Sequence, residues 1–330
     1  MVNERQTYAS MIWRQFKKSR LAVVSLFVVA ALVVIALLAP FIANERPILM
    51  RHAGEWSMPI FDKASLTLSE LDVIKDSSSG DLWFINPPIP FGPTTYDLDS
   101  VLSPPTKKHL LGTDGDGRDI VSQLIWGSRI SLSVGVVAIG IAAIIGIIFG
   151  LLAGYFGGWA DMIISRLIEI MTCFPTFFLI LTVLAFVGPS IFNIMVVIGI
   201  TGWTGIARLV RGECLKVRGR QFVHAAVVSG ARDGRIMWRH ILPHALAPVL
   251  VSVSFGVASA ILAEAALSFL GFGVPASTAS WGSMLSEAQE YMDIGWWLTL
   301  VPGSAIFVTI MAYNLIGEAL RDAIDPNMKT

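Results

Sequence analysis

The chain has 330 residues, of which 54% are hydrophobic and only 15% are charged, with a formal net charge of zero. Soluble domains average about 45–50% apolar and about 25% charged residues, so this composition excludes an ordinary soluble protein and indicates an integral membrane protein. The mean hydropathy of +0.68 points the same way. The zero net charge by itself says little about partners, and no nucleic-acid partner is expected.

Six apolar runs are long enough to cross the hydrocarbon core of a bilayer, which takes about 20 residues. We predict transmembrane helices at about 21–43, 130–155, 162–187, 190–210, 245–270 and 295–316. The first run follows a cluster of basic residues, a pattern shared with cleavable signal peptides. Its apolar stretch of about 19 residues exceeds the usual 7–15 of a signal peptide, which favours an uncleaved anchor.

The distribution of basic residues predicts the orientation. Five Lys or Arg lie in the first twenty residues and eight lie in 207–243, whereas 271–295 holds none. Because Lys and Arg favour the cytoplasmic side, we predict that both termini and segment 207–243 are cytoplasmic and that 44–128 and 271–295 are outside. An even number of spans agrees with termini on one side.

This topology divides the chain into three parts: a cytoplasmic tail with the first helix (1–43), an extracytoplasmic loop or cap (44–128) and a five-helix core (129–330). Loop 44–128 is too long for a plain connection. It is either a small irregular cap on the outer ends of the spans or a docking surface for an external partner, and the sequence leaves both open.

No metal site is predicted. In HLLGTDGDGRDI (109–120), a calcium loop starting at Asp114 has Asp116 at position 3 but Arg118 at position 5 and Ile125 at position 12, where the pattern needs an acid and a glutamate. A Gly/Asp-rich tight turn is the better interpretation. Histidines 224, 240 and 244 are too loosely spaced for a metal cluster, and cysteines 173 and 214 predict no disulfide.

Glycine and proline within the spans indicate packing and bending. Glycines 135, 140, 146, 150 and 154 recur through the second span, as expected where helices pack closely in lipid. Pro175 predicts a kink in the third span, because proline removes a backbone donor.

Charged residues inside spans are costly and are therefore functional candidates. Arg166 and Glu169 stand three residues apart at the predicted inner end of the third span, share a helix face and are predicted to form a structural pair. Glu264 lies inside the fifth span and must face protein or water. It either lines a polar pathway or bonds to a neighbouring helix.

The basic segment 221–243, QFVHAAVVSGARDGRIMWRHILP, interrupts the apolar runs. We predict short helices at 221–229 and 233–241, broken at Gly230 and ended by Pro243. We call residues 221–243 the knuckle. Its mixture of apolar and cationic side chains suits either a lipid surface or a groove on a protein partner.

The pattern HAAVVSG…ILP resembles the EAA loop of bacterial ABC-importer permeases, with His224 in place of the motif's Glu. In that family the loop, here about 211–243, forms a coupling helix that sits in a cleft of the ATPase subunit. The resemblance therefore implies roles in coupling for His224, Ala225, Ala226, Gly230, Asp233, Ile241, Leu242 and Pro243. The family's carboxylate is therefore missing at that position, which affects a charge contact there and not the knuckle itself.

Further motifs are similar to those of the second, C-type permease of the dipeptide/oligopeptide/nickel branch: GTDGDGRDI (112–120), GSRISLSVG (127–135), LSFLGFGVP…SWGSML (267–285) and GEALRDAIDPN (317–327). The resemblance implies an all-α type I importer permease with six transmembrane helices in the bacterial inner membrane. It also implies a second homologous permease, two ATP-binding cassette subunits and an extracytoplasmic substrate-binding protein. Peptides are the expected substrates, with nickel or glutathione as alternatives.

The sequence contains no GxxxxGK[ST], HExxH or CxxC motif, so we expect no enzymatic activity and no cofactor in this chain, with ATP and magnesium bound by partner subunits. A self-sufficient secondary transporter is the alternative of a different class. Such transporters usually have internal repeats and paired discontinuous helices, and neither is evident in the sequence.

Overall fold

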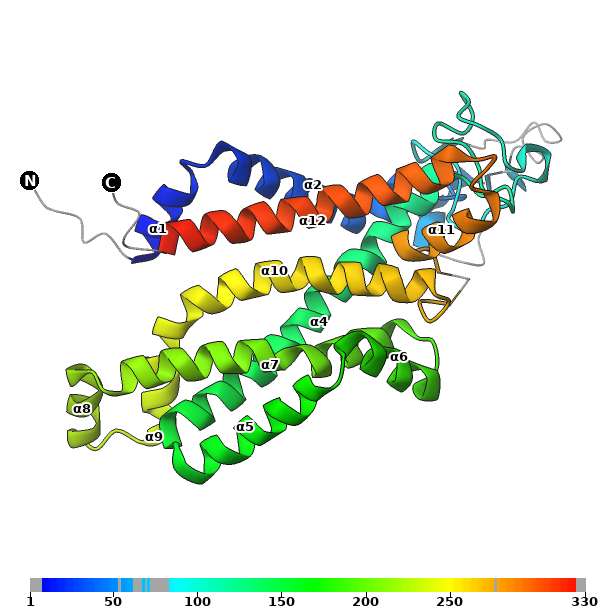
Figure 1. The fold of residues 1–330 in the computed structure, drawn as a ribbon. Helices are drawn as coiled ribbons and strands as arrows, with labels where there is room; N and C mark the ends of the chain where they lie inside the picture. The colour runs from blue at the N-terminus through cyan, green and yellow to red at the C-terminus, as the bar shows by residue number, and fades with distance from the viewer. Residues whose placement is uncertain are drawn as a thin grey trace, which may run out of the picture. The chain divides into compact units, whose positions relative to one another are not determined.

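A computed structural model of the chain describes residues 8–52, 55–61, 67–68, 70–71, 83–275 and 278–324. These residues are mainly helical (Figure 1). The chain divides into two compact units, the first comprising Met1–Val29, Val134–Glu264 and Val308–Thr330, and the second Ala30–Ser133 and Ala265–Phe307. Four long helices continue from one unit into the other: α2 (Arg20–Ile42), α4 (Ile120–Phe156), α10 (Leu242–Phe269) and α12 (Trp296–Ile324).

Five to six segments of the described residues match the predicted membrane spans. Five are single stretches of helix long and apolar enough to cross: α2, α4, α7 (Ile191–Arg218), α12, and α10 together with the turns that precede it from Asp233. The pair α5 (Gly158–Cys173) and α6 (Thr176–Val187) is apolar enough to cross only when taken together, and it is bent by 84°, so it forms either a broken sixth span or a re-entrant loop. The break falls at Phe174 and Pro175, which confirms the predicted kink, since proline has no N–H to continue the hydrogen bonds of α5.

Several helices are longer than their apolar runs. Helix α4 begins at Ile120 instead of about 130, and α7 continues to Arg218, past the predicted end near 210. The start of α4 has a local cause: the Asp119 carboxylate accepts the Ser122 backbone N–H at 2.8 Å, as an N-cap does. The apolar run marks only the part of a helix that suits lipid, whereas helical hydrogen bonding extends into the polar ends.

In the first unit, α4 and α7 pack at very short range through glycine. A Cβ atom added at Gly146, Gly150 or Gly154 would come within 2.6–2.8 Å of a side chain on α7. Gly140 has open space around it. Small residues thus let two helices approach closely where lipid gives no hydrophobic drive between them. The predicted role of the glycines holds for these three and for Gly135, where an added Cβ would come within 2.7 Å of Ile261 on α10, and not for Gly140.

Helices near the two described ends of the chain also pack together within the first unit. A short helix that the sequence did not predict, α1 (Tyr8–Phe16), precedes α2, and Phe16 is buried in a small cluster with Ala22 and Ala319. Ala319 belongs to the last part of α12. The described ends of the chain therefore lie on one side, as the even number of spans requires.

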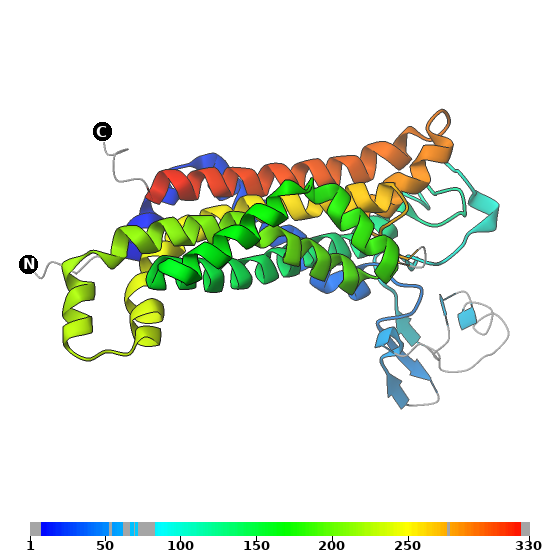
Figure 2. The same ribbon diagram turned by 60° about the horizontal axis from the view of Figure 1, so that its bottom comes forward.

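The second unit contains a small antiparallel sheet (Figure 2). Its order is β2-β1-β3, formed by β1 (Leu49–His52), β2 (Glu55–Ser57) and β3 (Trp83–Ile85). Arg51 lies opposite both Trp56 and Trp83, and the two indole rings meet edge to face at 5.7 Å. Short 3-10 turns, η1 (Pro59–Phe61) and η2 (Leu98–Ser100), complete the described part of loop 44–128.

Three tryptophans fasten this loop and α11 (Trp281–Ala288) to the helix ends of the second unit. Each donates its indole N–H to a backbone carbonyl oxygen. Trp126 bonds to Ala43 at 2.7 Å, Trp281 to Leu124 at 3.0 Å, and Trp297 to Thr113 at 3.1 Å. A single turn, η4 (Gln289–Tyr291), follows α11. The described part of loop 44–128 is therefore a cap packed on the ends of α2, α4 and α12, and its use as a docking surface stays a prediction.

Candidate functional site

The first half of the knuckle is helix α8 (Gln221–Val228), which ends in a glycine-dependent turn. Gly230 has φ of +76°, the left-handed region that favours glycine. Its N–H donates to the Val227 carbonyl at 2.9 Å, and the Ala231 N–H donates to the Ala226 carbonyl at 3.1 Å. This pair of bonds is a Schellman motif with Gly230 at the C′ position, so the predicted break at Gly230 is confirmed.

The second half differs from the prediction. Helix α9 (Asp233–Arg235) leads into a π-helical turn, η3 (Ile236–Ile241), and then directly into α10. The Leu242 N–H donates to the Met237 carbonyl, five residues back, instead of to the fourth. This π-helical turn accommodates Pro243, which has no N–H to donate, and the helix continues past it into α10. The prediction that Pro243 ends a helix was wrong.

The knuckle has a buried and an exposed side. Val223, Ile236, Met237 and Ile241 are buried in the core of the first unit. At the tip of the knuckle, the Val228 side chain is 88% exposed. Within the described chain this aliphatic side chain is therefore left largely uncovered.

The predicted coupling residues divide between these two sides. The exposed members are available to a partner: His224, Ala225, Gly230, Asp233 and Pro243. Ala226 is half-buried, whereas Ile241 and Leu242 are buried and hold the knuckle to the core.

Two polar contacts attach the knuckle and its approach to the end of α4. The Tyr155 hydroxyl donates to the Asp233 carboxylate at 2.7 Å. The Arg218 guanidinium donates to the carbonyl oxygens of Gly154 at 3.3 Å and Tyr155 at 2.9 Å, the last turn of α4. A cation at this end of a helix also complements the helix dipole. This role of Tyr155 was not predicted, because no local pattern of the sequence links residues 78 positions apart.

An ion pair joins α5 to α7 nearby. Arg211 donates from Nε and Nη2 to both carboxylate oxygens of Asp161, at 2.5 and 2.7 Å. This fork geometry is the strong bidentate form of the interaction. The beginning of α5 is therefore fixed to α7 at Arg211, ten residues before the knuckle begins at Gln221.

The structure also places the charged residues that were predicted within spans. Arg166 Nη1 and Glu169 Oε2 are 2.5 Å apart, so the predicted pair forms, with side chains that are 72% and 58% exposed. Glu264 is fully buried in α10. Its burial favours the alternative in which it bonds within the protein, and a role in a pathway stays a prediction.

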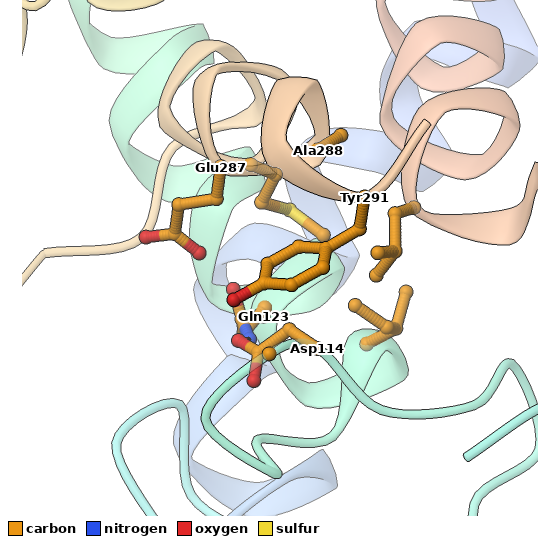
Figure 3. Close-up of a pocket in the computed structure, with 9 residues that line it drawn as sticks. Asp114, Gln123, Glu287, Ala288 and Tyr291 are labelled. Atoms are coloured by element: carbon orange, nitrogen blue, oxygen red, sulfur yellow. Dashed lines mark hydrogen bonds between the residues drawn. The ribbon is translucent and has the colours of Figure 1, made fainter. Parts of the chain in front are cut away.

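In the second unit, the predicted tight turn 112–120 is the centre of an ionic cluster. Arg118 is buried and contacts Asp114 and Glu287, each at 2.7 Å. Asp114, Gln123, Glu287 and Tyr291 surround a cavity of about 10 Å³, the room of about one water molecule (Figure 3). Sequence reasoning missed this cluster, since Arg118 and Glu287 are 169 positions apart.

Charge and burial shift the pKa values of groups in this part of the second unit. Hydrogen bonding from Lys108, with a further bond from His109, lowers the pKa of Asp97 to about 2. Burial raises the pKa of Glu287, although Arg118 opposes the shift. His109 is 1% exposed and lies between Asp97 and Asp119, at 3.1 and 3.0 Å. The cluster therefore fastens the loop to the start of α4 and to α11.

These observations define the chain as a multi-pass helical membrane protein with a compact knuckle between two of its spans. Residues 146–330 match the model of the family described as binding-protein-dependent transport system inner membrane components. Residues 7–53 match the N-terminal transmembrane domain of oligopeptide transport permease C. Because the first match covers more than half of the chain, the protein belongs to the family of binding-protein-dependent transport system inner membrane components.

Curated relatives agree with this assignment. The chain is 42% identical over 229 residues to the dipeptide transport system permease protein DppC of Alkalihalophilus pseudofirmus, covering 69% of this chain and 75% of the relative. It is 33% identical over 324 residues to DppC of Bacillus subtilis, covering 98% and 87%. It is also 40% identical over 235 residues to the glutathione transport system permease protein GsiD of Pectobacterium atrosepticum, covering 71% and 78%.

Among solved structures, a chain of the methionine ABC transporter MetNI in an inward-facing conformation superposes with a TM-score of 0.50 at 17% identity. The match covers 62% of this chain and 98% of that chain. At this identity the likeness concerns the fold alone, and it supports the predicted fold of an ABC importer permease.

Proposed function

We propose that this chain is a permease subunit of an ATP-driven ABC importer that carries peptides delivered by an extracytoplasmic binding protein. The observation that carries the proposal is the knuckle: a short helix, a Schellman turn at Gly230 and a second helical segment, anchored by buried residues and exposing a tip. A compact element of this kind fits a groove on a protein partner. Membership of the family points to an ATPase subunit as that partner.

The proposed mechanism follows from how the knuckle is connected. ATP binding closes the ATPase pair and moves the element held in its clefts. The knuckle lies between α7 and α10 along the chain, and Tyr155 links it to α4 through Asp233. Displacement of the knuckle thus reaches three spans as a rigid-body change between two states of the pathway.

The partners follow from the same proposal. A second, homologous permease supplies the other half of the pathway, and two ATP-binding cassette subunits bind the knuckles from the cytoplasmic side of the bacterial inner membrane. ATP and magnesium are bound by those subunits, since this sequence has no phosphate-binding loop. The chain has no hydrolytic role in this scheme.

The substrate class rests on the relatives. Relatives along most of this chain are named as dipeptide, di/tripeptide or oligopeptide permeases. A glutathione permease is 40% identical. We therefore propose short peptides, with glutathione and nickel as the alternatives to be tested.

Uptake by the reconstituted complex tests the proposal. The two permeases, the ATPase pair and the binding protein are assembled in proteoliposomes with radiolabelled trialanine, glutathione or nickel outside. ATP-dependent accumulation of trialanine that requires every component supports the proposal. Accumulation by this chain alone, without ATPase subunits, would identify a secondary transporter instead.

A further inference from the structure

A buried histidine of the second unit has a carboxylate on each side of its ring. The side chains of His109 and Asp119 are 1% and 2% exposed, and that of Asp97 is 14% exposed. His109 Nδ1 lies 3.0 Å from Asp119 Oδ2, and His109 Nε2 lies 3.1 Å from Asp97 Oδ2. An ionised carboxylate can only accept hydrogen bonds, so both ring nitrogens face acceptors. We call Asp97, Lys108, His109 and Asp119 the histidine clasp.

The surroundings of His109 fix the ring in this place. The His109 N–H donates to Thr106 Oγ1 at 3.0 Å. The His109 carbonyl accepts the N–H groups of Thr106 at 2.8 Å and Gly112 at 3.0 Å. The Phe91 ring packs against the imidazole, with the ring centroids 4.5 Å apart. The two contacts to carboxylates therefore follow from the fold of the loop and not from a freely rotating side chain.

Both carboxylates of the clasp are held in the ionised form. Lys108 donates to Asp97, and this bond is the main reason why the pKa of Asp97 falls to about 2. Asp119 Oδ1 accepts the Ser122 N–H at 2.8 Å, at the start of α4. A negative charge is favoured at this end of a helix. Neither aspartate is therefore placed to supply a proton to its contact with the ring.

The proton that these contacts need must come from His109. A neutral imidazole has one N–H and one bare nitrogen, so one contact would set a nitrogen lone pair against a carboxylate. An imidazolium has two N–H donors and completes both contacts. It also balances the clasp, because the two carboxylates then meet two cations, His109 and Lys108. Burial makes this balance important, since an uncompensated charge is costly away from water.

We propose that His109 is an imidazolium at neutral pH and that the histidine clasp is a proton-dependent fastening of loop 44–128 to the start of α4. Asp97 belongs to the loop and Asp119 directly precedes α4, so one proton completes the connection between them. Loss of this proton leaves one carboxylate without its donor. The inference goes beyond the proposed function and holds whatever the chain transports.

The other charged groups around the clasp do not replace this proton. Among the described residues, the charged side chains in contact with the ring are Asp97 and Asp119. Arg118 precedes Asp119 in the chain, but its guanidinium is engaged with three other carboxylates, those of Asp114, Asp116 and Glu287. A neutral His109 would therefore leave the clasp with an excess negative charge.

The direction of the pH dependence follows from this charge state. In an unfolded chain, histidine loses its proton near about pH 6.5. The folded chain keeps the proton at neutral pH, so it binds more protons than the unfolded chain does. The clasp therefore contributes stability that is present below about pH 6.5 and is lost as the pH rises to the point where the folded chain releases the proton. This direction is opposite to that of Asp97, whose contribution is lost in acid.

Nitrogen NMR reads the charge of the ring directly. The full chain, with isotopically labelled histidine, is studied in lipid nanodiscs at neutral pH, and the His109→Gln variant assigns the His109 signals. An imidazolium gives two protonated ring nitrogens, whereas a neutral ring gives one protonated and one bare nitrogen. We expect two protonated nitrogens for His109. A bare nitrogen on His109 at neutral pH would overturn the proposal.

The Asp97→Asn variant tests the cause of the charge. An asparagine amide can donate to the bare nitrogen of a neutral ring while the other nitrogen donates to Asp119. We therefore expect His109 in this variant to lose its second proton at a lower pH than in the wild type. Lys107→Gln, which removes an exposed charge of the same loop, should leave that pH unchanged. Release of the proton at an equal or higher pH in Asp97→Asn would contradict the clasp.

Proteolysis tests the fastening itself. Lys108 is 59% exposed within the clasp, and the exposed Lys18, between α1 and α2, is the reference site. Trypsin is applied to the chain in nanodiscs over a series of pH values, with a lysine peptide as a correction for the protease. Because the lost contact is a hydrogen bond between charged groups, cleavage at Lys108 should rise about tenfold or more relative to Lys18 as His109 becomes neutral. An unchanged ratio across the deprotonation of His109 would show that the loop stays fastened without the proton and would refute the inference.

Discussion

Replacement of Gly230 by valine is expected to weaken the connection between ATP hydrolysis and transport. A Cβ atom at Gly230 would meet nothing within 4 Å, so the cost of substitution comes from the backbone alone. The residue has φ of +76°, and an L-amino acid in the left-handed region costs about 1–2 kcal/mol, more for a β-branched side chain. A free-energy change of about 1.4 kcal/mol corresponds to a tenfold change in an equilibrium constant. The substitution therefore lowers the equilibrium population of the native turn by about 5- to 30-fold relative to glycine.

The comparison with asparagine isolates this backbone effect. Asparagine tolerates the left-handed region, so Gly230→Asn should retain far more uptake than Gly230→Val although it adds a larger polar group. ATP hydrolysis and trialanine uptake are measured on the same proteoliposomes. We expect Gly230→Val to continue hydrolysing ATP while its uptake per ATP falls by about 5- to 30-fold. Wild-type uptake per ATP in a fully assembled Gly230→Val complex would refute the reasoning.

Three further predictions concern the contacts around the site. Tyr155→Phe removes the hydroxyl bonded to Asp233, which costs about 0.5–1.5 kcal/mol and should lower uptake per ATP several-fold without preventing assembly. Gly150→Ala should lower the free energy of unfolding by about 1–3 kcal/mol because the added methyl group forces α4 and α7 apart. Gly140→Ala should leave the free energy of unfolding unchanged or raise it, because the methyl group has open space there. The lowered pKa of Asp97 predicts stability that is present above about pH 3.8 and is lost as the pH falls through about 2.

Each of these has a contrary result. Unchanged uptake per ATP in Tyr155→Phe would remove α4 from the proposed route of coupling. Equal melting temperatures for the Gly150 and Gly140 variants would contradict the close contact of α4 with α7. The Asp97→Asn variant should lose the acid-dependent part of the unfolding curve measured at graded pH, and an identical pH dependence in variant and wild type would contradict the contribution of Asp97.

The features predicted correctly from the sequence depend on neighbours in the chain. Apolar run length predicts membrane spans because each span must satisfy its own backbone hydrogen bonds in lipid. Proline at 175 and glycine at 230 act through their own φ angles and donors, so the break between α5 and α6 and the turn after α8 could be predicted locally. The same local rule failed at Pro243, where a π-helical turn shifts the hydrogen bonds and lets the helix continue.

The features that were missed depend on residues far apart in the chain. Arg118 finds Glu287 across 169 positions, and Tyr155 finds Asp233 across 78. Sequence alone gives the charges of these residues and not their partners. The exposure of the Arg166–Glu169 pair was likewise outside local reasoning, which predicted the pair and not the direction in which it points.

Accessibility of the tip of the knuckle tests the central claim most directly. Val228 is 88% exposed there, and a Val228→Cys variant in a Cys173→Ser background carries one exposed thiol among the described cysteine positions. A membrane-impermeant maleimide is applied to right-side-out and inside-out vesicles, with and without the ATPase subunits. The account predicts labelling only in inside-out vesicles and protection by bound ATPase subunits. Labelling in right-side-out vesicles, or labelling that the ATPase subunits leave unchanged, would contradict it.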